Sequence, residues 1–174
     1  MSQPPATNGA DATPFRAPDT EGRALARHLI TTARHGALAV LDPATGAPAV
    51  TRVGVGLAQA DGLYLFVSGL AAHTAALAAD PRAGLLLGEP GPKGDPLTHP
   101  RLSLSVSAEP TEESQRPELS RRWLTEHPKA KLYTELADFR FVFLRITGGA
   151  LNGGFGRAWK FTAEDLRDGA ATTP

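Results

Sequence analysis

Residues 63–88 constrain the fold more than any other part of the chain. They combine an apolar strand pattern at 63–67, a segment of small residues that favours a short helix, and a second apolar strand at 83–88. Asp80-Pro81 ends the helix, because proline lacks a backbone N–H and disfavours helical backbone in the preceding residue. The segment therefore predicts two strands joined by a short helix.

Two further stretches alternate with the period of a strand. Residues 101–108 place Leu102, Leu104 and Val106 between serines, which is typical of a half-buried strand. Residues 139–144 alternate phenylalanines with Arg140 and aliphatic side chains. This second pattern predicts a long strand, central in the sheet and buried on both faces over part of its length.

The other expected elements are short. In the first half of the chain they are a helix from Asp19 or Thr20 to about Arg34, a hairpin of 36–41 and 47–57, a turn at 60–62 and an irregular loop at 89–96. A helical stretch follows from Thr111, which Pro117 either divides into two pieces or delays until about Glu118, and a helical turn follows at 129–136. A last strand segment is flanked by Gly148-Gly149 and the glycines of 153–156, and a final helix is capped by Thr162. About six to seven strands with short peripheral helices result. Because strand edges must be hidden, we expect a mainly β fold with α additions, an antiparallel split barrel.

Length and composition fit one soluble domain. The 174 residues suffice for one core, and we expect a domain at 19–168 between a flexible leader at 1–18 and a flexible tail at 169–174. Eighteen basic and eighteen acidic residues cancel, so the charge favours neither nucleic acid nor an anionic membrane. No signal-like or membrane-spanning apolar run occurs, which predicts a cytoplasmic protein. The absence of cysteine excludes disulfides and thiolate metal sites.

The opening of the predicted short helix is a candidate phosphate site. Ser68, Ala72, His73 and Thr74 lie where unpaired backbone N–H groups and partial positive charge attract anions. Arg52, in an apolar strand, could add a bidentate contact. The alternatives are an outward-facing arginine and a surface histidine at a helix start. Fingerprints of the doubly wound and P-loop nucleotide folds are absent, so a mononucleotide on a barrel fits better.

Other catalytic chemistry has weak support in the sequence. The carboxylate pairs Glu112-Glu113 and Glu164-Asp165 stand at predicted helix starts, where acids favour the helix dipole. No Ser-His-Asp order and no His-x-x-x-His spacing supports hydrolysis or zinc, so we assign no metal ligand and no catalytic side chain.

The chain resembles a known family over about residues 23–166. The strings are Thr51-Arg-Val, Leu65-Phe-Val-Ser68, Ala71-Ala-His-Thr74, Leu77 and Asp80-Pro-Arg82. They are similar to the FMN-binding split-barrel family of pyridoxamine 5′-phosphate oxidase-like proteins. The strings LAAHTAALAADPRA, GDPLTHPRLSLS and LNGGFGRA most resemble its haem-utilisation HugZ-like branch.

This resemblance implies roles for particular residues. Arg52 matches a strand arginine that contacts the FMN phosphate, with Val53 in the same segment, and Ser68 matches a residue beside the cofactor. His73 and Ala72 stand where the oxidases have a phosphate-binding lysine and an arginine, and the HugZ-like branch has His-Thr, which makes His73 and Thr74 the expected ligands. Arg101 matches a polar contact to the flavin ring edge. The resemblance also implies a homodimer with FMN at its interface.

Matches to the oxidase substrate site are weaker. Arg116 and Ser120 fit its Arg-Pro-x-x-Ser segment, but Glu112 replaces a tyrosine. Asn152 and Arg157 fit a second substrate segment, but Trp159 replaces a histidine.

The sequence therefore predicts an FMN-dependent oxidoreductase acting on an undetermined small molecule, in which flavin supplies the redox chemistry. A haem-binding or haem-degrading protein is the first alternative, although no histidine follows His127. His28 and His35, seven residues apart on a predicted helix, fit solvated surface residues better than a ligand pair. A binding or regulatory module that has lost the cofactor is the second alternative.

Overall fold

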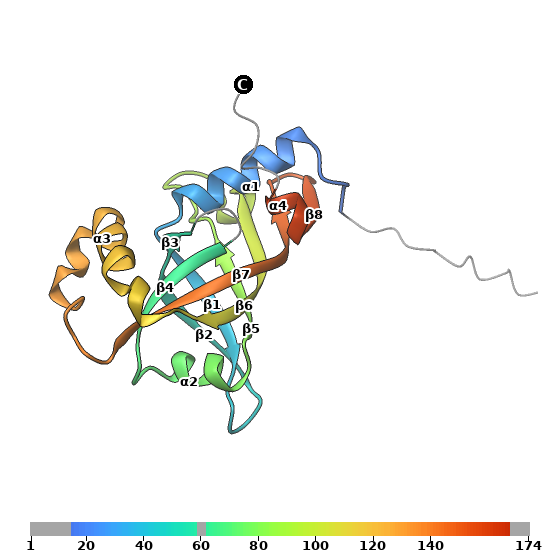
Figure 1. Cartoon of the computed structure of the whole chain (residues 1–174). Coiled ribbons are helices and arrows are strands. Elements are labelled where there is room, and N and C mark those ends of the chain that lie inside the picture. The colour runs from blue at the N-terminus through green and yellow to red at the C-terminus, as the bar shows by residue number, and fades with distance from the viewer. Residues whose placement is uncertain (1–14, 59–61, 168–174) are drawn as a thin grey trace, which may run out of the picture.

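The eight strands in the described part of the chain join one antiparallel sheet. The computed structural model describes residues 15–58 and 62–167 (Figure 1). The strands are β1 (His35–Leu41), β2 (Pro48–Gly54), β3 (Gly56–Leu57), β4 (Gly62–Ser68), β5 (Arg82–Leu87), β6 (Arg101–Pro110), β7 (Phe139–Asn152) and β8 (Ala158–Thr162). Their order is β2-β1-β5-β6-β7-β4-β3, with β8 also paired to β7. The long strand predicted at 139–144 is central, between β6 and β4, as expected.

The sheet curls into a partly closed barrel. β2 lies against β4 without a hydrogen-bonded ladder between them, which leaves the barrel split there. The helices are α1 (Thr20–Thr32), α2 (Ala72–Ala79), α3 (Arg116–Glu126) and α4 (Ala163–Arg167), with 3₁₀ turns η1 (Pro96–Thr98), η2 (Glu113–Gln115) and η3 (Pro128–Leu132). α1 covers one end of the barrel, α2 the other, and α3 lies at one side (Figure 1). The predicted mainly β split barrel is confirmed.

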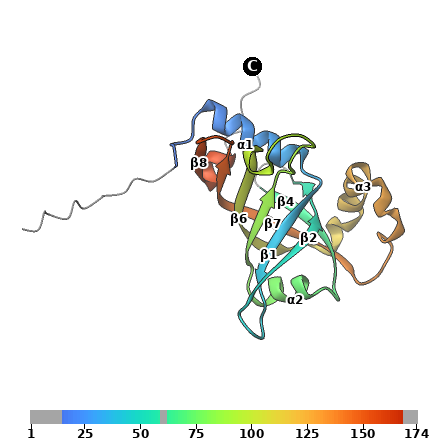
Figure 2. The same cartoon turned by 180° about the vertical axis from the view of Figure 1, so that it is seen from behind.

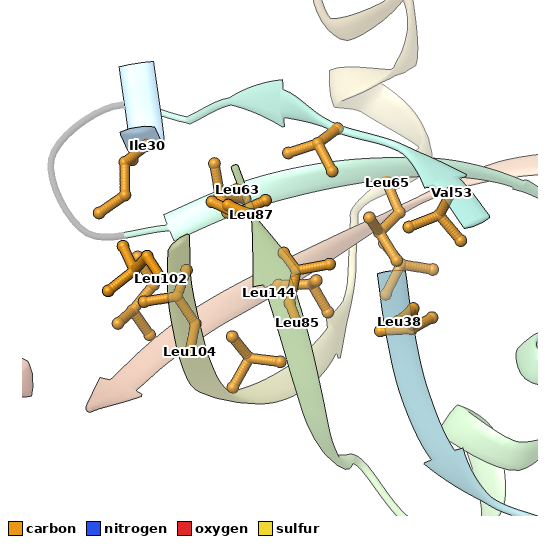
Figure 3. Close-up of a cluster of buried hydrophobic side chains, with 14 of the residues drawn as sticks. Ile30, Leu38, Val53, Leu63, Leu65, Leu85, Leu87, Leu102, Leu104 and Leu144 are labelled. Atoms are coloured by element: carbon orange, nitrogen blue, oxygen red, sulfur yellow. The ribbon is translucent and has the colours of Figure 1, made fainter. Parts of the chain in front are cut away.

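The barrel interior is filled by aliphatic side chains from every long strand. Leu38, Leu65, Leu85 and Leu144 are each at most 1% exposed, and Ile30 of α1 enters the same cluster (Figure 3). Each Å² of apolar surface that this core removes from water stabilises the fold by about 25 cal/mol. The core also fixes the strand register, because a one-residue slip would move the apolar side chains of a strand to its outer face.

A second core lies outside the barrel, beneath α3. Phe66 of β4 and Phe141 of β7 have ring centroids 4.5 Å apart, and Trp123 of α3 packs on both. This core explains why the strand at 139–144 is buried on two faces: Phe141 points to α3 while Leu144 points into the barrel. The outer face of β4 and β7 is therefore covered.

The outer face formed by β2, β1 and β5 is uncovered. Seen from behind, these strands cross the front of the molecule with no helix over them (Figure 2). Val50 is 69% exposed and Leu86 is 41% exposed on this face. The register places Arg52 beside Ala37, Ala37 beside Leu86, and Leu86 beside Ser103, so these four side chains form one row on it.

Several boundaries differ from the sequence prediction. Gly148 and Gly149 lie inside β7 and do not interrupt it: Ser105 pairs with Gly148 and Val106 with Ile146, so the extra residue of a bulge is Thr147 of β7, directly before the glycines. β8 is an additional strand that the glycine-rich sequence before it obscured. The division expected around Pro117 is confirmed, in contrast: the short turn η2 precedes α3, and Pro117 lies in the first turn of α3.

The ends of the main domain follow the expected capping. The Asp19 carboxylate accepts a hydrogen bond from Gly22 N at 2.7 Å and caps α1, and Thr162 and Asp165 cap α4 reciprocally. Arg16 N also bonds to Ala158 O at 2.7 Å, which ties the chain before α1 to β8. Most of the predicted leader (1–14), the tail (168–174) and part of the turn at 60–62 lie outside the described residues.

Candidate functional site

The turn that leads from β4 into α2 is held by side-chain hydrogen bonds. Thr74 donates from Oγ1 to the carbonyl oxygen of Ser68 at 2.7 Å, and Leu70 N donates to Ser68 Oγ at 3.1 Å. Ser68 Oγ in turn donates to the Asp138 carboxylate at 2.5 Å. The Ser68 and Thr74 hydroxyls, both predicted to bind phosphate, thus donate their hydrogen bonds to protein acceptors. In this structure they hold the turn in shape.

The first turn of α2 offers backbone donors. Ala71 is its N-cap in extended backbone and makes no side-chain cap. Thr74 N and Ala75 N bond back to Ala71 O, whereas the N–H groups of Ala72 and His73 have no partner among the residues described. These two groups, with the positive end of the helix dipole, are suited to an anion.

His73 is half-buried beside these donors. Its Nε2 atom is inaccessible to solvent and makes no hydrogen bond within the described chain. Burial lowers the pKa of the His73 imidazole below its ordinary value of 6.5, so the ring is neutral at pH 7. A neutral imidazole can donate one hydrogen bond, and Nε2 is an unused position for it.

Arg52 is an exposed cation on β2. β2 leads into β3, which pairs with β4, the strand that ends at Ser68. β2 and β4 are in contact. The described residues give the Arg52 guanidinium no hydrogen bond or ion pair. Val53, in contrast, points into the core and is 5% exposed, so only its backbone can face a ligand on the outer side.

Arg101 and Asn152 are brought together at the other end of the sheet. They pair across β6 and β7. Arg101 donates from Nη1 to Leu97 O at 2.9 Å, and Asn152 accepts from Gly154 N at 2.9 Å. Arg101 therefore supports the loop before β6, and the remaining N–H groups of its guanidinium are available to bind a ligand.

The four predicted substrate residues do not converge within one chain. Arg116 is on α3 and donates to Phe139 O at 2.7 Å, and half-buried Ser120 is one turn further along. Arg157, near Asn152 and β8, pairs with Glu21 of α1 at 2.5 Å. α3 and β8 lie on opposite sides of the barrel (Figure 1).

Asp138 and Arg140 belong to the site region although the sequence analysis gave neither a role. A cavity of about 650 Å³ between α2 and the ends of β6 and β7 is lined by both, together with Thr74 and Arg116. A Cβ atom on Gly69 would lie 2.4 Å from Arg140 Nη2, so this guanidinium rests against the turn before α2. The sequence held one signal for Arg140, namely that it is a charged residue within an apolar strand pattern.

Two general features bound the chemistry. Across residues 15–58 and 62–167, no group of three or more His, Asp or Glu side chains is placed to hold a metal ion. In the same ranges no helix has the length and apolar character needed to cross a membrane.

Comparison with known proteins gives consistent matches. The family model described as Pyridoxamine 5′-phosphate oxidase matches residues 23–152. One solved structure is 48% identical over 87% of this chain and 99% of its own, with a TM-score of 0.78. No curated protein matches the sequence.

Two further solved structures are similar to this chain. A heme binding protein from Mycobacterium smegmatis is 31% identical over 84% of this chain, with a TM-score of 0.76. The protein Atu2129, of unknown function, from Agrobacterium tumefaciens is 35% identical over 90% of it, with a TM-score of 0.76. The chain spans 60% and 65%, respectively, of the lengths of those two proteins.

Proposed function

This chain belongs to the pyridoxamine 5′-phosphate oxidase family, and we propose that it is a flavoprotein that binds FMN at the opening of α2 and acts as an oxidoreductase on a small molecule. The observation that carries the proposal is the pair of backbone donors without a partner among the described residues there, the N–H groups of Ala72 and His73. The Arg52 guanidinium, which has no partner among the described residues, supplies the matching charge. Family membership makes FMN the first ligand to test.

The residues present fit a phosphate monoester. Arg52 would make the charge-assisted contact, and the backbone of Ala72 and His73 would donate to the remaining oxygens. Ser68 and Thr74 would hold the turn in shape through their existing hydrogen bonds. The Asp138 carboxylate, next to Ser68, opposes an anion and sets an upper limit on its affinity.

The uncovered outer face gives the isoalloxazine ring a place to lie. From Arg52 the outer row runs through Ala37 and Leu86 to Ser103. Arg101, two residues before Ser103, starts the same strand and would face the ring edge. Bound flavin supplies hydride or electron transfer, while these residues bind it and orient it.

We infer that two copies pack through this face. Val50 and Leu86 are exposed on it, and a two-fold dimer would bury the same patch on both copies. Packing of this kind would also exclude water from a bound flavin. In a single copy the outer face, and a flavin on it, would be open to solvent.

Haem binding is the second candidate. It is favoured by the heme binding protein from Mycobacterium smegmatis, which is 31% identical. Three histidines are engaged: His35 with Glu89, His99 with Gly91 and Lys93, and His127 with Val55. His28 and His73 are thus the axial ligands to test.

Titration of the purified protein with FMN and separately with haemin distinguishes the two functions. The proposal predicts saturable FMN binding that quenches flavin fluorescence. A haemin complex with a shifted Soret band that His28→Ala or His73→Ala abolishes, together with no FMN binding, would replace it by the haem function. Binding of neither ligand would leave a cofactor-free module.

A further inference from the structure

The cavity of about 650 Å³ between α2 and the ends of β6 and β7 lies at the end of the barrel that α2 covers (Figure 1). Its volume falls within the range of about 300–1,000 Å³ that small-molecule sites occupy. The cavity adjoins the turn before α2, but Arg52, Ala72 and His73 are not among the residues that line it. It is therefore a separate hollow of the molecule, next to the candidate FMN site.

The floor of this cavity is apolar. Leu77 of α2 is 6% exposed and Val142 of β7 is 8% exposed, and both belong to the barrel core where it borders the cavity. Ala78, Pro81 and Ala108 extend the apolar lining. An apolar ligand on this floor would remove both surfaces from water, so the floor favours a ligand with an apolar body.

Arg140 of β7 supplies a cation in the lining. Its guanidinium makes no hydrogen bond or ion pair with the residues that the structure describes. A Cβ atom on Gly69 would lie 2.4 Å from Arg140 Nη2. Gly69 does not have the positive φ that favours glycine, so its lack of a side chain matters here because it leaves room for the guanidinium. Arg116, the other arginine in the lining, already donates from Nη1 to Phe139 O at 2.7 Å. Arg140 is thus the better placed of the two to bind a ligand.

Three carboxylates also line the cavity and limit the charge that a ligand can carry. Glu109 forms a bidentate ion pair with Arg145, at 2.6 and 2.8 Å. Asp138 accepts a hydrogen bond from Ser68 Oγ and forms no ion pair within the described ranges, and the Glu113 side chain is 87% exposed. A doubly charged phosphate would be repelled by these acids. A single carboxylate carries less charge and matches the planar guanidinium fork.

We propose that this cavity is a second ligand site, which binds a small monocarboxylate with an aliphatic body. The carboxylate would accept two hydrogen bonds from Arg140, and the aliphatic body would lie on Leu77 and Val142. One end of such a ligand meets the cation and the other meets the apolar floor, which neither an inorganic anion nor a neutral hydrocarbon can do. The site requires no FMN, so it does not depend on the proposed function.

Octanoate is the probe for this site, and ¹H–¹⁵N NMR locates its binding on the protein. The proposal predicts saturable shifts at the amides of Gly69, Ala78 and Arg140. Octylammonium, which has the same body and the opposite charge, should give no saturable shift. Arg140→Gln should raise the octanoate dissociation constant at least about tenfold, because it removes a charge-assisted contact. Arg121→Gln changes an exposed arginine of α3 outside the cavity and is the control.

Filling the cavity gives a second readout that keeps every charge. Ala75 and Ala78 are both exposed on α2, but of the two only Ala78 lines the cavity. Ala78→Trp should therefore abolish octanoate binding while Ala75→Trp preserves it, and circular dichroism checks the fold of each variant.

Three results would overturn the proposal. They are the absence of saturable octanoate shifts in the wild type, an unchanged dissociation constant for Arg140→Gln, and displacement of octanoate by FMN, which would make the cavity part of the cofactor site. A protein that binds octanoate as described but no FMN would support the proposal and overturn the proposed function alone.

Discussion

The Ser68 hydroxyl donates a 2.5 Å hydrogen bond to the Asp138 carboxylate, although 70 residues separate them in the chain. This bond joins the turn before α2 to the entry of β7. It also brings a negative charge to the candidate phosphate site, which the sequence gave no reason to expect.

Asp138→Asn should therefore strengthen FMN binding. Asparagine retains an oxygen that can accept the Ser68 hydrogen bond, but it removes the charge that repels phosphate. Because the group is partly solvated, we expect a gain of about 0.5–1 kcal/mol that shrinks at high salt. Isothermal titration calorimetry at two salt concentrations measures it, and weaker FMN binding would show that Asp138 assists the site through its charge.

Arg52→Ala should weaken FMN binding by about 1.5–3 kcal/mol, the cost of losing a charge-assisted hydrogen bond to phosphate. The free energy of unfolding should change by less than about 0.5 kcal/mol, because the side chain is exposed and makes no hydrogen bond or ion pair within residues 15–58 and 62–167. Fluorescence titration and urea denaturation measure the two quantities. Arg27→Ala, an exposed arginine on α1, is the control, and an FMN dissociation constant equal to that control's would remove Arg52 from the site.

His73 should make the protein less stable in mild acid. Burial lowers the pKa of the folded imidazole below 6.5, so the unfolded chain binds the proton more readily. The His73 contribution is fully present above pH 6.5 and is lost as the pH falls through the folded pKa. Urea denaturation between pH 7.5 and 5 should give a steeper pH dependence for the wild type than for His73→Gln, and parallel curves would contradict the prediction.

Gly22→Ala should destabilise the protein although alanine is the better helix former. A Cβ on Gly22 would lie 2.9 Å from three ring atoms of Trp159, which is fully buried and cannot yield. Overpacking costs about 1–3 kcal/mol, against a helix gain of about 0.5–1 kcal/mol. Thermal denaturation measures the balance, with Ala24→Gly on the exposed face of α1 giving the propensity term alone. A higher melting temperature for Gly22→Ala would mean that α1 shifts freely on β8.

Most of the strands and short helices followed from local patterns. The serine alternation before Ala108 and the phenylalanine alternation after Asp138 gave β6 and β7, because period-two burial is visible in sequence. Gly148-Gly149 misled the prediction at the end of β7, since the continuation of the strand past the bulge at Thr147 depends on pairing with β6 and β8. β8 was missed for a related reason: it is stabilised by pairing with β7 and by burial of Trp159, neither of which its short sequence reveals.

Part of the local structure around the candidate site was predictable from the sequence. The helix opening at Ala72 is where the sequence placed it, because small residues after an apolar strand mark such a turn. The hydrogen bonds that the Ser68 and Thr74 hydroxyls donate depend on distances between segments, and so does the contact of Arg140 with Gly69. Local sequence carries no information on these contacts.

The most direct test of the phosphate site is to compare the dissociation constants of FMN and riboflavin for the same preparation, since the two ligands differ by the phosphate alone. The account predicts FMN binding at least about tenfold tighter, with Arg52→Ala removing most of the difference, because one charge-assisted contact contributes about 1.5–3 kcal/mol. Equal affinity for the two ligands, or no binding of either, would contradict it.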